Sequence, residues 1–155
     1  MKKALFLGIT IFITTFSGNL LASSTIEPSP EVKINIEREW KGIRGGYTEP
    51  QRLIILTQEE WEEVWKKVYN LSIPHPALPE IDFDKEMAIA VFMGERNSGG
   101  YRIEIEEIVE SEEEIVVKVK ETSPSPESFL TMALTQTYHI VVIEKTPILV
   151  TFVNL

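Results

Sequence analysis

The stretch "MAIAVFMGERNSGGYRIEI", residues 87–105, decides the fold of this chain. Its first part, residues 87–93, is an unbroken apolar run, and its last part, residues 101–105, alternates between apolar and charged side chains. Both patterns predict strands. The segment between them, residues 94–100, is polar and rich in glycine, which indicates a loop. Loops held by a rigid sheet are frequent places for binding, so this segment is the first candidate for a functional site.

Further strands are predicted on both sides of this stretch, and they make the chain mainly β. Their apolar and alternating patterns place them at residues 32–44, 51–57, 101–108, 115–121, 138–144 and 148–153.

The charged residues of 101–108 and 115–121 predict how these two strands pair. An antiparallel register, joined by the acidic turn 110–114, sets opposite charges side by side on one face and apolar residues on the other. The predicted pairs are Glu106 with Lys118, Glu104 with Lys120, and Ile105 with Val119. Ile108 falls out of phase with this register, which predicts a β-bulge near residues 106–107.

A helix is predicted at about residues 58–69. Thr57 and Glu60 have the spacing of a capping box, in which the two side chains satisfy free backbone N–H groups at the start of a helix. Apolar residues follow at helical spacing and form one stripe: Trp61, Val64, Trp65 and Val68. Two tryptophans could form a platform for a ligand, but their place on this stripe predicts that they belong to the core.

These elements predict an α+β fold, a single domain with a mainly antiparallel β-sheet and one amphipathic helix. The alternative is a β-sandwich with one added helix. If the later strands form an antiparallel meander, alternate connections lie at the same end of the sheet. The loops 94–100 and 122–137 would then share one end and form a contiguous surface.

Residues 1–24 are predicted to be a signal peptide, residues 25–31 a linker and residues 32–155 the folded domain. A basic start, a short apolar stretch and small residues near position 24 have the order of a secretory signal. The alternative is an anchor helix that is not cleaved. The chain contains no Cys, which excludes a lipid anchor on cysteine as well as disulfides. We therefore expect an exported protein, periplasmic or extracellular, that is not lipid-anchored.

The charge of the chain limits its partners. The net charge is −9, with 15 basic and 24 acidic residues. Residues 1–24 hold two lysines and no acid, so the cleaved chain would carry 13 basic and 24 acidic residues, a net charge of −11. Such a surface repels nucleic acids and anionic lipids, which are bound by clustered Lys and Arg. We expect no nucleic-acid partner and, after cleavage, no membrane partner.

The motifs of common enzymes are incomplete in this sequence. Gly94 and Gly99 have the spacing of a phosphate-binding loop, but the Lys and hydroxyl residue that should follow are missing. Ser98 and His139 could meet across the shared loop end, but the strand-to-helix turn that exposes a serine nucleophile is absent. Asp82 and Asp84 do not complete a calcium loop, and two scattered histidines do not make a zinc site. We therefore expect no catalytic residues, no metal site and no cofactor.

Several segments taken together resemble a known family. They are "DF" at 82–83, "VFMGERNSGGY" at 91–101, "ETSPSP" at 121–126 and "TQTYHIVVI" at 135–143. From about residue 37 to residue 153 the chain resembles the PrcB C-terminal-domain family, the small exported accessory subunit of a bacterial surface protease complex. The resemblance implies a non-catalytic protein whose partner is a protease or another protein of the cell envelope.

Carried onto this chain, the resemblance implies a partner-binding site in the loops 94–101 and 122–139. Its candidate residues are Gly94, Arg96, Asn97, Gly99, Gly100, Tyr101, Thr135, Tyr138 and His139. Thr137 stands where the family motif commonly has Pro, which is a departure from the pattern. Arg and Tyr are residue types that dominate interface energies. The alternatives are that Gly99 and Gly100 only form a turn and that Tyr101 belongs to the core.

The runner-up function is protease inhibition. The segment "RNSGGY", residues 96–101, resembles the N-P-T-T-G-Y/F loop of the chagasin-like inhibitors of cysteine proteases, which also bind through loops at one end of a β-fold. The proline of that loop is missing here, and no clear G-x-G-G loop follows.

Overall fold

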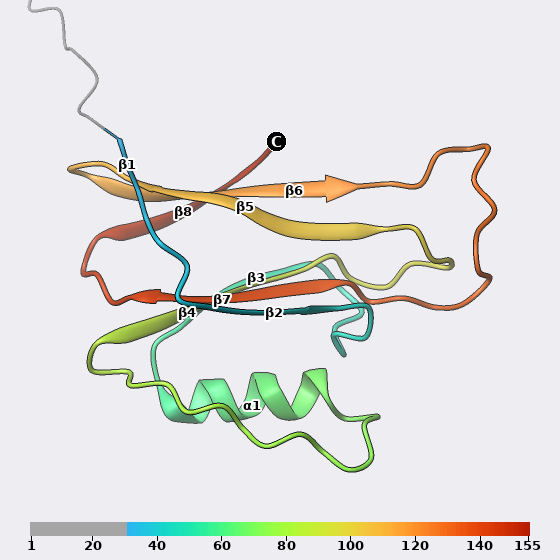
Figure 1. Ribbon diagram of the computed structural model, residues 1–155, viewed down its shortest axis with the longest axis horizontal. Helices are drawn as coiled ribbons and strands as arrows, with labels where there is room; N and C mark the ends of the chain where they lie inside the picture. The colour runs from blue at the N-terminus through green and yellow to red at the C-terminus, as the bar shows by residue number, and fades with distance from the viewer. Residues whose placement is uncertain (1–30) are drawn as a thin grey trace, which may run out of the picture.

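The structure is a computed structural model and describes residues 31–155 of the chain (Figure 1). The expected signal peptide and residues 25–30 of the expected linker lie outside the described residues. The described part contains one helix, α1 (Gln58–Val68), and eight strands. The strands are β1 (Val32–Lys33), β2 (Arg38–Gly42), β3 (Gln51–Ile55), β4 (Glu86–Phe92), β5 (Arg102–Glu110), β6 (Glu114–Thr122), β7 (Tyr138–Glu144) and β8 (Leu149–Asn154).

The strands form two four-stranded sheets that pack face to face, with α1 on the outer side of one of them (Figure 1). The first sheet has the order β1-β5-β6-β8 and the second the order β2-β7-β4-β3. All pairs are antiparallel except the parallel pair β6–β8. The prediction of a mainly antiparallel α+β domain is confirmed. The strands are layered as in the alternative, a β-sandwich with an added helix.

The predicted meander is wrong, because β7 pairs with β4 and β2 and not with β6. The physical reason is that β4 and β7 are apolar on both faces. All but one residue of each strand is buried. Such strands must be covered on both sides. They therefore lie together at the centre of the second sheet, between the first sheet and α1.

Two apolar cores result from this layering, and β4 contributes alternate residues to each. Ala88, Ala90 and Phe92 face α1, whereas Ile89 and Val91 face the first sheet. A strand whose side chains alternate between two buried faces explains the unbroken apolar run seen in the sequence.

The helix is confirmed, together with its capping box. The Thr57 side chain accepts from the Glu60 backbone N–H, and the Glu60 side chain accepts from the Thr57 N–H. The two tryptophans belong to the core, as predicted. The indole N–H of Trp61 donates to the carbonyl of Pro79 at 2.9 Å, and that of Trp65 to the carbonyl of Pro76 at 3.2 Å. The indoles thereby fasten the proline-containing loop over α1.

The hairpin β5–β6 is confirmed, including its bulge. Glu104 pairs with Lys120 and Ile105 with Val119, and the register shifts between residues 105 and 107. The predicted pair Glu106–Lys118 is wrong, because the bulge moves Glu107 opposite Lys118. The carboxylate of Glu107 accepts from the Lys118 ammonium at 2.9 Å, so the ion pair forms one residue further along.

The predicted strand 32–44 is also wrong, since it is divided between the two sheets. β1 pairs with β5 in the first sheet and β2 with β7 in the second. Residues 34–37 cross from one sheet to the other. Ile34 and Ile36 pack against the core between the sheets as the chain crosses. Ile34 and Ile36 therefore alternate with polar residues as predicted, but they belong to a segment that connects the two sheets and not to a strand.

In residues 31–155 there is no helix with the length and apolar character required to span a membrane.

Candidate functional site

The loops 94–100 and 122–137 lie side by side at one end of the sandwich, as predicted. Both project beyond the strands at the right-hand end of Figure 1. Arg96 and Thr135 exchange two backbone hydrogen bonds, of 2.8 and 2.9 Å. The Gly99 N–H donates to the Thr131 carbonyl at 2.9 Å, and the Thr135 hydroxyl donates to the Ser98 carbonyl at 2.8 Å. In the structure the connections between the strands are residues 93–101 and 123–137, and these two segments are called the paired loops below.

Two glycines permit the paired loops to fold in this way. Gly94 has a φ of +78° and Gly100 a φ of +87°, which side chains rarely tolerate. A Cβ on Gly94 would lie 2.8 Å from the Thr48 carbonyl oxygen, and a Cβ on Gly100 would lie 2.8 Å from the Pro124 side chain. Gly100 therefore allows one of the paired loops to pack closely on the other.

A third segment, residues 43–46, is joined to the paired loops by hydrogen bonds of Gln136. Its backbone N–H donates to the Ile43 carbonyl at 2.8 Å, and its carbonyl accepts from the Gly45 N–H at 2.7 Å. Its side-chain amide donates to the Glu95 carboxylate at 2.9 Å and accepts from the Gly46 N–H at 3.0 Å. This role of Gln136 could not be predicted from the sequence, because a glutamine in a loop carries no pattern of its own.

Arg96 and Tyr101 lie together at the base of the loops. The guanidinium of Arg96 stands 5.7 Å from the centre of the Tyr101 ring and also donates to the Glu95 carbonyl at 3.1 Å. Tyr101 is half-buried and packs against the core between the sheets, so it has both a core and a surface side. Asn97 is exposed and Gly99 is half-buried.

Of the other predicted site residues, Gly100 is exposed, and the rest are buried: Gly94, Thr135, Tyr138 and His139. Tyr138 points to the helix side, where its hydroxyl donates to the Tyr69 hydroxyl at 3.3 Å, and burial raises its pKa. The prediction that this set contacts a partner stays a prediction. The buried residues would contribute to partner binding by holding the conformation of the loops.

His139 lies between the two sheets, with 1% of its surface exposed. Its Nδ1 accepts from the Ile105 backbone N–H at 2.8 Å, so the ring proton is on Nε2, which donates to the Glu39 carboxylate at 3.0 Å. Burial lowers the pKa of His139, and the hydrogen bond to Glu39 offsets this only in part. The imidazole is therefore neutral near pH 7. Both ring nitrogens are occupied, and neither can serve Ser98 as a base.

The paired loops expose large apolar side chains that are not among the predicted site residues. Phe129 is 106% exposed, Met132 87% and Leu134 64%. Leu130 turns inward instead and lies within 3.0 Å of the position that a Cβ on Gly100 would take. The signal was present in the segment "SFLTMALT", residues 128–135, which is apolar without the period of a helix or a strand.

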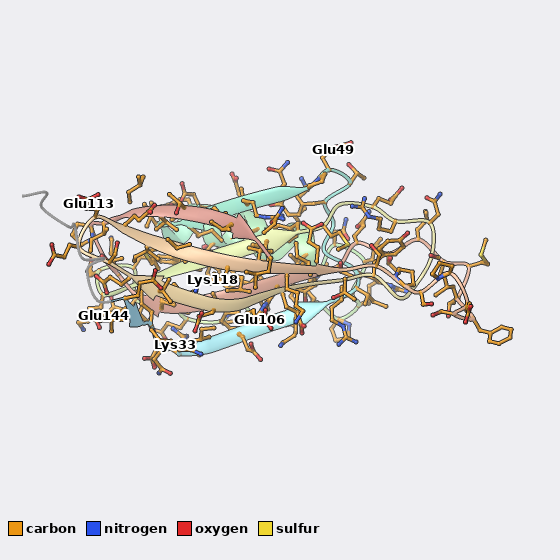
Figure 2. The ribbon with its side chains drawn as sticks, turned by 90° about the horizontal axis from the view of Figure 1, so that it is seen from above. Lys33, Glu49, Glu106, Glu113, Lys118 and Glu144 are labelled. Atoms are coloured by element: carbon orange, nitrogen blue, oxygen red, sulfur yellow. The ribbon has the colours of Figure 1, made fainter. Side chains whose placement is uncertain are left out.

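The paired loops carry only three charged side chains, Glu95, Arg96 and Glu127, and most of the charge lies on other parts of the described chain. Figure 2 shows Lys33, Glu106 and Lys118 over the first sheet, and Glu113 and Glu144 at the end opposite the paired loops. Within residues 31–155, no three His, Asp or Glu side chains are close enough to hold one metal ion. The paired loops thus present three large exposed apolar side chains among polar residues, whereas the first sheet carries charged ones (Figure 2).

Residues 87–144 match the family described as PrcB C-terminal. This match confirms the resemblance over residues 87–144, a segment that runs from the second residue of β4 to the end of β7 and includes both of the paired loops. No curated protein and no solved structure matches the chain.

Proposed function

We propose that this protein is exported and acts as a non-enzymatic binding module, an accessory or stabilising subunit of a protease complex. It binds its partner through the loops 94–101 and 122–139. The observation that carries the proposal is the exposure of Phe129, Met132 and Leu134 on a loop that backbone hydrogen bonds hold in place.

Exposed apolar side chains gathered on one loop support a protein partner. Exposing large apolar side chains to water is unfavourable, and apolar side chains grouped on a surface mark interaction sites. Phenylalanine and methionine are enriched in the centres of protein interfaces. The same segment falls within the family match, which supports a protein partner of the kind that the family resemblance implies, a protease.

The anchoring of the loop supports tight binding. Arg96, Gly99 and Thr135 hold the loop through backbone and hydroxyl hydrogen bonds, so less conformational freedom is lost when a partner binds. This gives the predicted residues a role beside that of Phe129 and Met132. They set the position of the loop, and the apolar side chains make the contact.

The proposal is tested by co-purification and by protease activity. The full-length sequence is expressed in its source with a C-terminal tag, together with the variant Phe129→Ser/Met132→Ser. The wild type is expected to retain a protein with proteolytic activity and to lengthen the lifetime of that activity. The double variant is expected to lose it.

A matched control is available on the loop after α1. Leu71 and Ile73 are 74% and 95% exposed, so Leu71→Ser/Ile73→Ser removes a similar apolar area outside the paired loops. This control is expected to keep the partner. If the loop variant keeps the partner, the paired loops are not the interface. If the wild type lowers the activity, the protein is an inhibitor. N-terminal sequencing of the exported protein tests cleavage near Ser24.

A further inference from the structure

The edge strand β8 is unlike the other edge strands of residues 31–155. Edges of sheets are commonly protected from pairing by charged residues, Pro, or shortness. β1 has only two residues, one of them Lys33. β2 has the sequence "REWKG" and β3 the sequence "QRLII", so each carries charge. β8 has the sequence "LVTFVN", with neither charge nor Pro over six residues.

The free backbone groups of β8 can be identified from its pairing with β6. The Leu155 N–H donates to the Val119 carbonyl at 2.9 Å, so the backbone groups of the odd-numbered residues face β6. Backbone groups alternate in direction along a strand. The N–H and C=O groups of Val150 and Phe152 therefore point away from the sheet, towards the edge that no described strand covers.

We infer that β8 pairs with β8 of a second copy of this chain, antiparallel and about a two-fold axis at Thr151. An interface of this kind is self-complementary, because each strand supplies the same surface. Val150 of one copy lies opposite Phe152 of the other, and both present free backbone groups for a hydrogen-bonded pair. The first sheet of one copy and the first sheet of the other then join into one continuous sheet of eight strands.

The side chains match in the same register. Leu149 and Val153, which are 68% and 46% exposed on the outer face, lie opposite each other across the interface. Val150 and Phe152 are half-buried against the core between the sheets, and their pairing extends that core into the second copy. An axis at Phe152 would instead set Asn154 opposite Val150 and Thr151 opposite Val153, so that polar residues face apolar ones. The axis at Thr151 is therefore favoured.

The charges next to β8 are also complementary in this register. On β6, Glu114 is the neighbour of Leu149 and Lys118 is the neighbour of Val153. A row across the interface therefore runs Glu114, Leu149, then Val153 and Lys118 of the second copy. The two-fold axis repeats this row in the opposite sense. An acidic chain thus meets its own copy at an uncharged strand with opposite charges on either side.

The inference is tested by the oligomeric state of the purified protein, expressed from the full-length sequence. Sedimentation equilibrium from low micromolar to millimolar concentration is expected to show a monomer–dimer equilibrium. Leu149→Lys/Val153→Lys places lysines opposite one another at both ends of the interface, and it is expected to raise the dimer dissociation constant roughly tenfold or more.

Leu149→Lys/Val153→Glu is the matched control, because it differs from the first variant by one charge sign. Each new lysine then faces a new glutamate of the second copy, and the dimer is expected to return. Both positions are exposed in the single chain, so folding is not expected to separate the two variants. Rescue of the dimer by the charge pair would establish the register as well as the strand.

Three results would overturn the inference: a wild type that stays monomeric throughout, a dimer that survives the double lysine variant, or no rescue by the charge pair. A monomer that loses a co-purifying protein in the lysine variant would show that a partner's strand occupies this edge instead of a second copy. Phe129→Ser/Met132→Ser is expected to dimerise normally. The dimer and the partner binding of the paired loops are therefore tested separately.

Discussion

The imidazole Nδ1 of His139 accepts a hydrogen bond from the backbone N–H of Ile105 at 2.8 Å, although the two residues belong to different sheets. His139 is in β7, and Ile105 lies in β5 where the register shifts at the bulge. A bulge disturbs the ladder of backbone hydrogen bonds and leaves groups in need of other partners. The histidine side chain supplies the acceptor and connects the two sheets.

Replacing His139 by Leu is expected to lower the free energy of unfolding by about 1–3 kcal/mol at neutral pH, the cost of leaving a buried donor without a partner. Urea denaturation measures this change. His139→Gln is the control, because its amide oxygen offers an acceptor, and it is expected to lose less. Equal stability of the Leu variant and the wild type would mean that the Ile105 N–H finds another acceptor.

The stability of the protein is expected to fall as the pH falls below about 6.5. Burial lowers the pKa of His139 in the folded state below its ordinary value of 6.5, whereas the unfolded chain keeps that value. Below pH 6.5 the unfolded state therefore binds more protons, and the loss of stability continues down to the folded-state pKa. The slope for one group is at most about 1.4 kcal/mol per pH unit.

This pH dependence is measured by urea denaturation between neutral and mildly acidic pH. The variant His139→Gln is expected to lose the dependence of the free energy of unfolding on pH that the wild type shows above the pH range in which carboxylates titrate. The groups that face the imidazole are Glu39, Lys41 and Glu104. Nitrogen-15 chemical shifts offer a direct check, since they should show a neutral ring with its proton on Nε2. A proton on Nδ1 at neutral pH would contradict the hydrogen bond from Ile105.

Local features of this fold could be predicted from the sequence because they depend on neighbouring residues. The capping box of Thr57 and Glu60 and the apolar stripe of α1 involve residues within one or two turns of a helix. The bulge in β5 could be predicted because Ile108 broke the alternation of its own strand. In each case the pattern and the structure that it determines are close together in the chain.

The sheet order could not be predicted in this way. β4 and β7 are apolar on both faces, so their patterns do not say which neighbour or which face each will take. The candidate site shows a related limit. The family resemblance pointed to the segment around Tyr138 and His139, but a motif does not distinguish residues that hold a loop from residues that contact a partner.

Gly100→Ala is expected to destabilise the protein and to loosen the paired loops. Its φ of +87° is unfavourable for alanine, and the new Cβ would lie 2.8 Å from the Pro124 side chain. Strain of this kind costs about 1–3 kcal/mol. Thermal unfolding measures the loss, and faster amide hydrogen exchange at Gly99 and Thr135 would show the loosening.

Gly99→Ala is the matched control, one residue away. A Cβ there would lie 3.8 Å from the nearest atom, the Thr131 Cβ, which is an ordinary contact. The stability is expected to change by less than about 0.5 kcal/mol. If the two alanine variants were equally stable, the close packing of Gly100 on Pro124 would not be needed to hold the paired loops.

The variant Phe129→Ser/Met132→Ser is expected to leave the stability of the protein unchanged, within about 0.5 kcal/mol. Phe129 and Met132 are 106% and 87% exposed, so they gain little from the folded state. Urea denaturation of this variant beside Gly100→Ala separates two ways of losing a partner. The serine variant should lose partner binding while it stays as stable as the wild type. Gly100→Ala should lose partner binding and stability together. A clear loss of stability in the serine variant would show that these side chains pack within the protein and are not free to contact a partner.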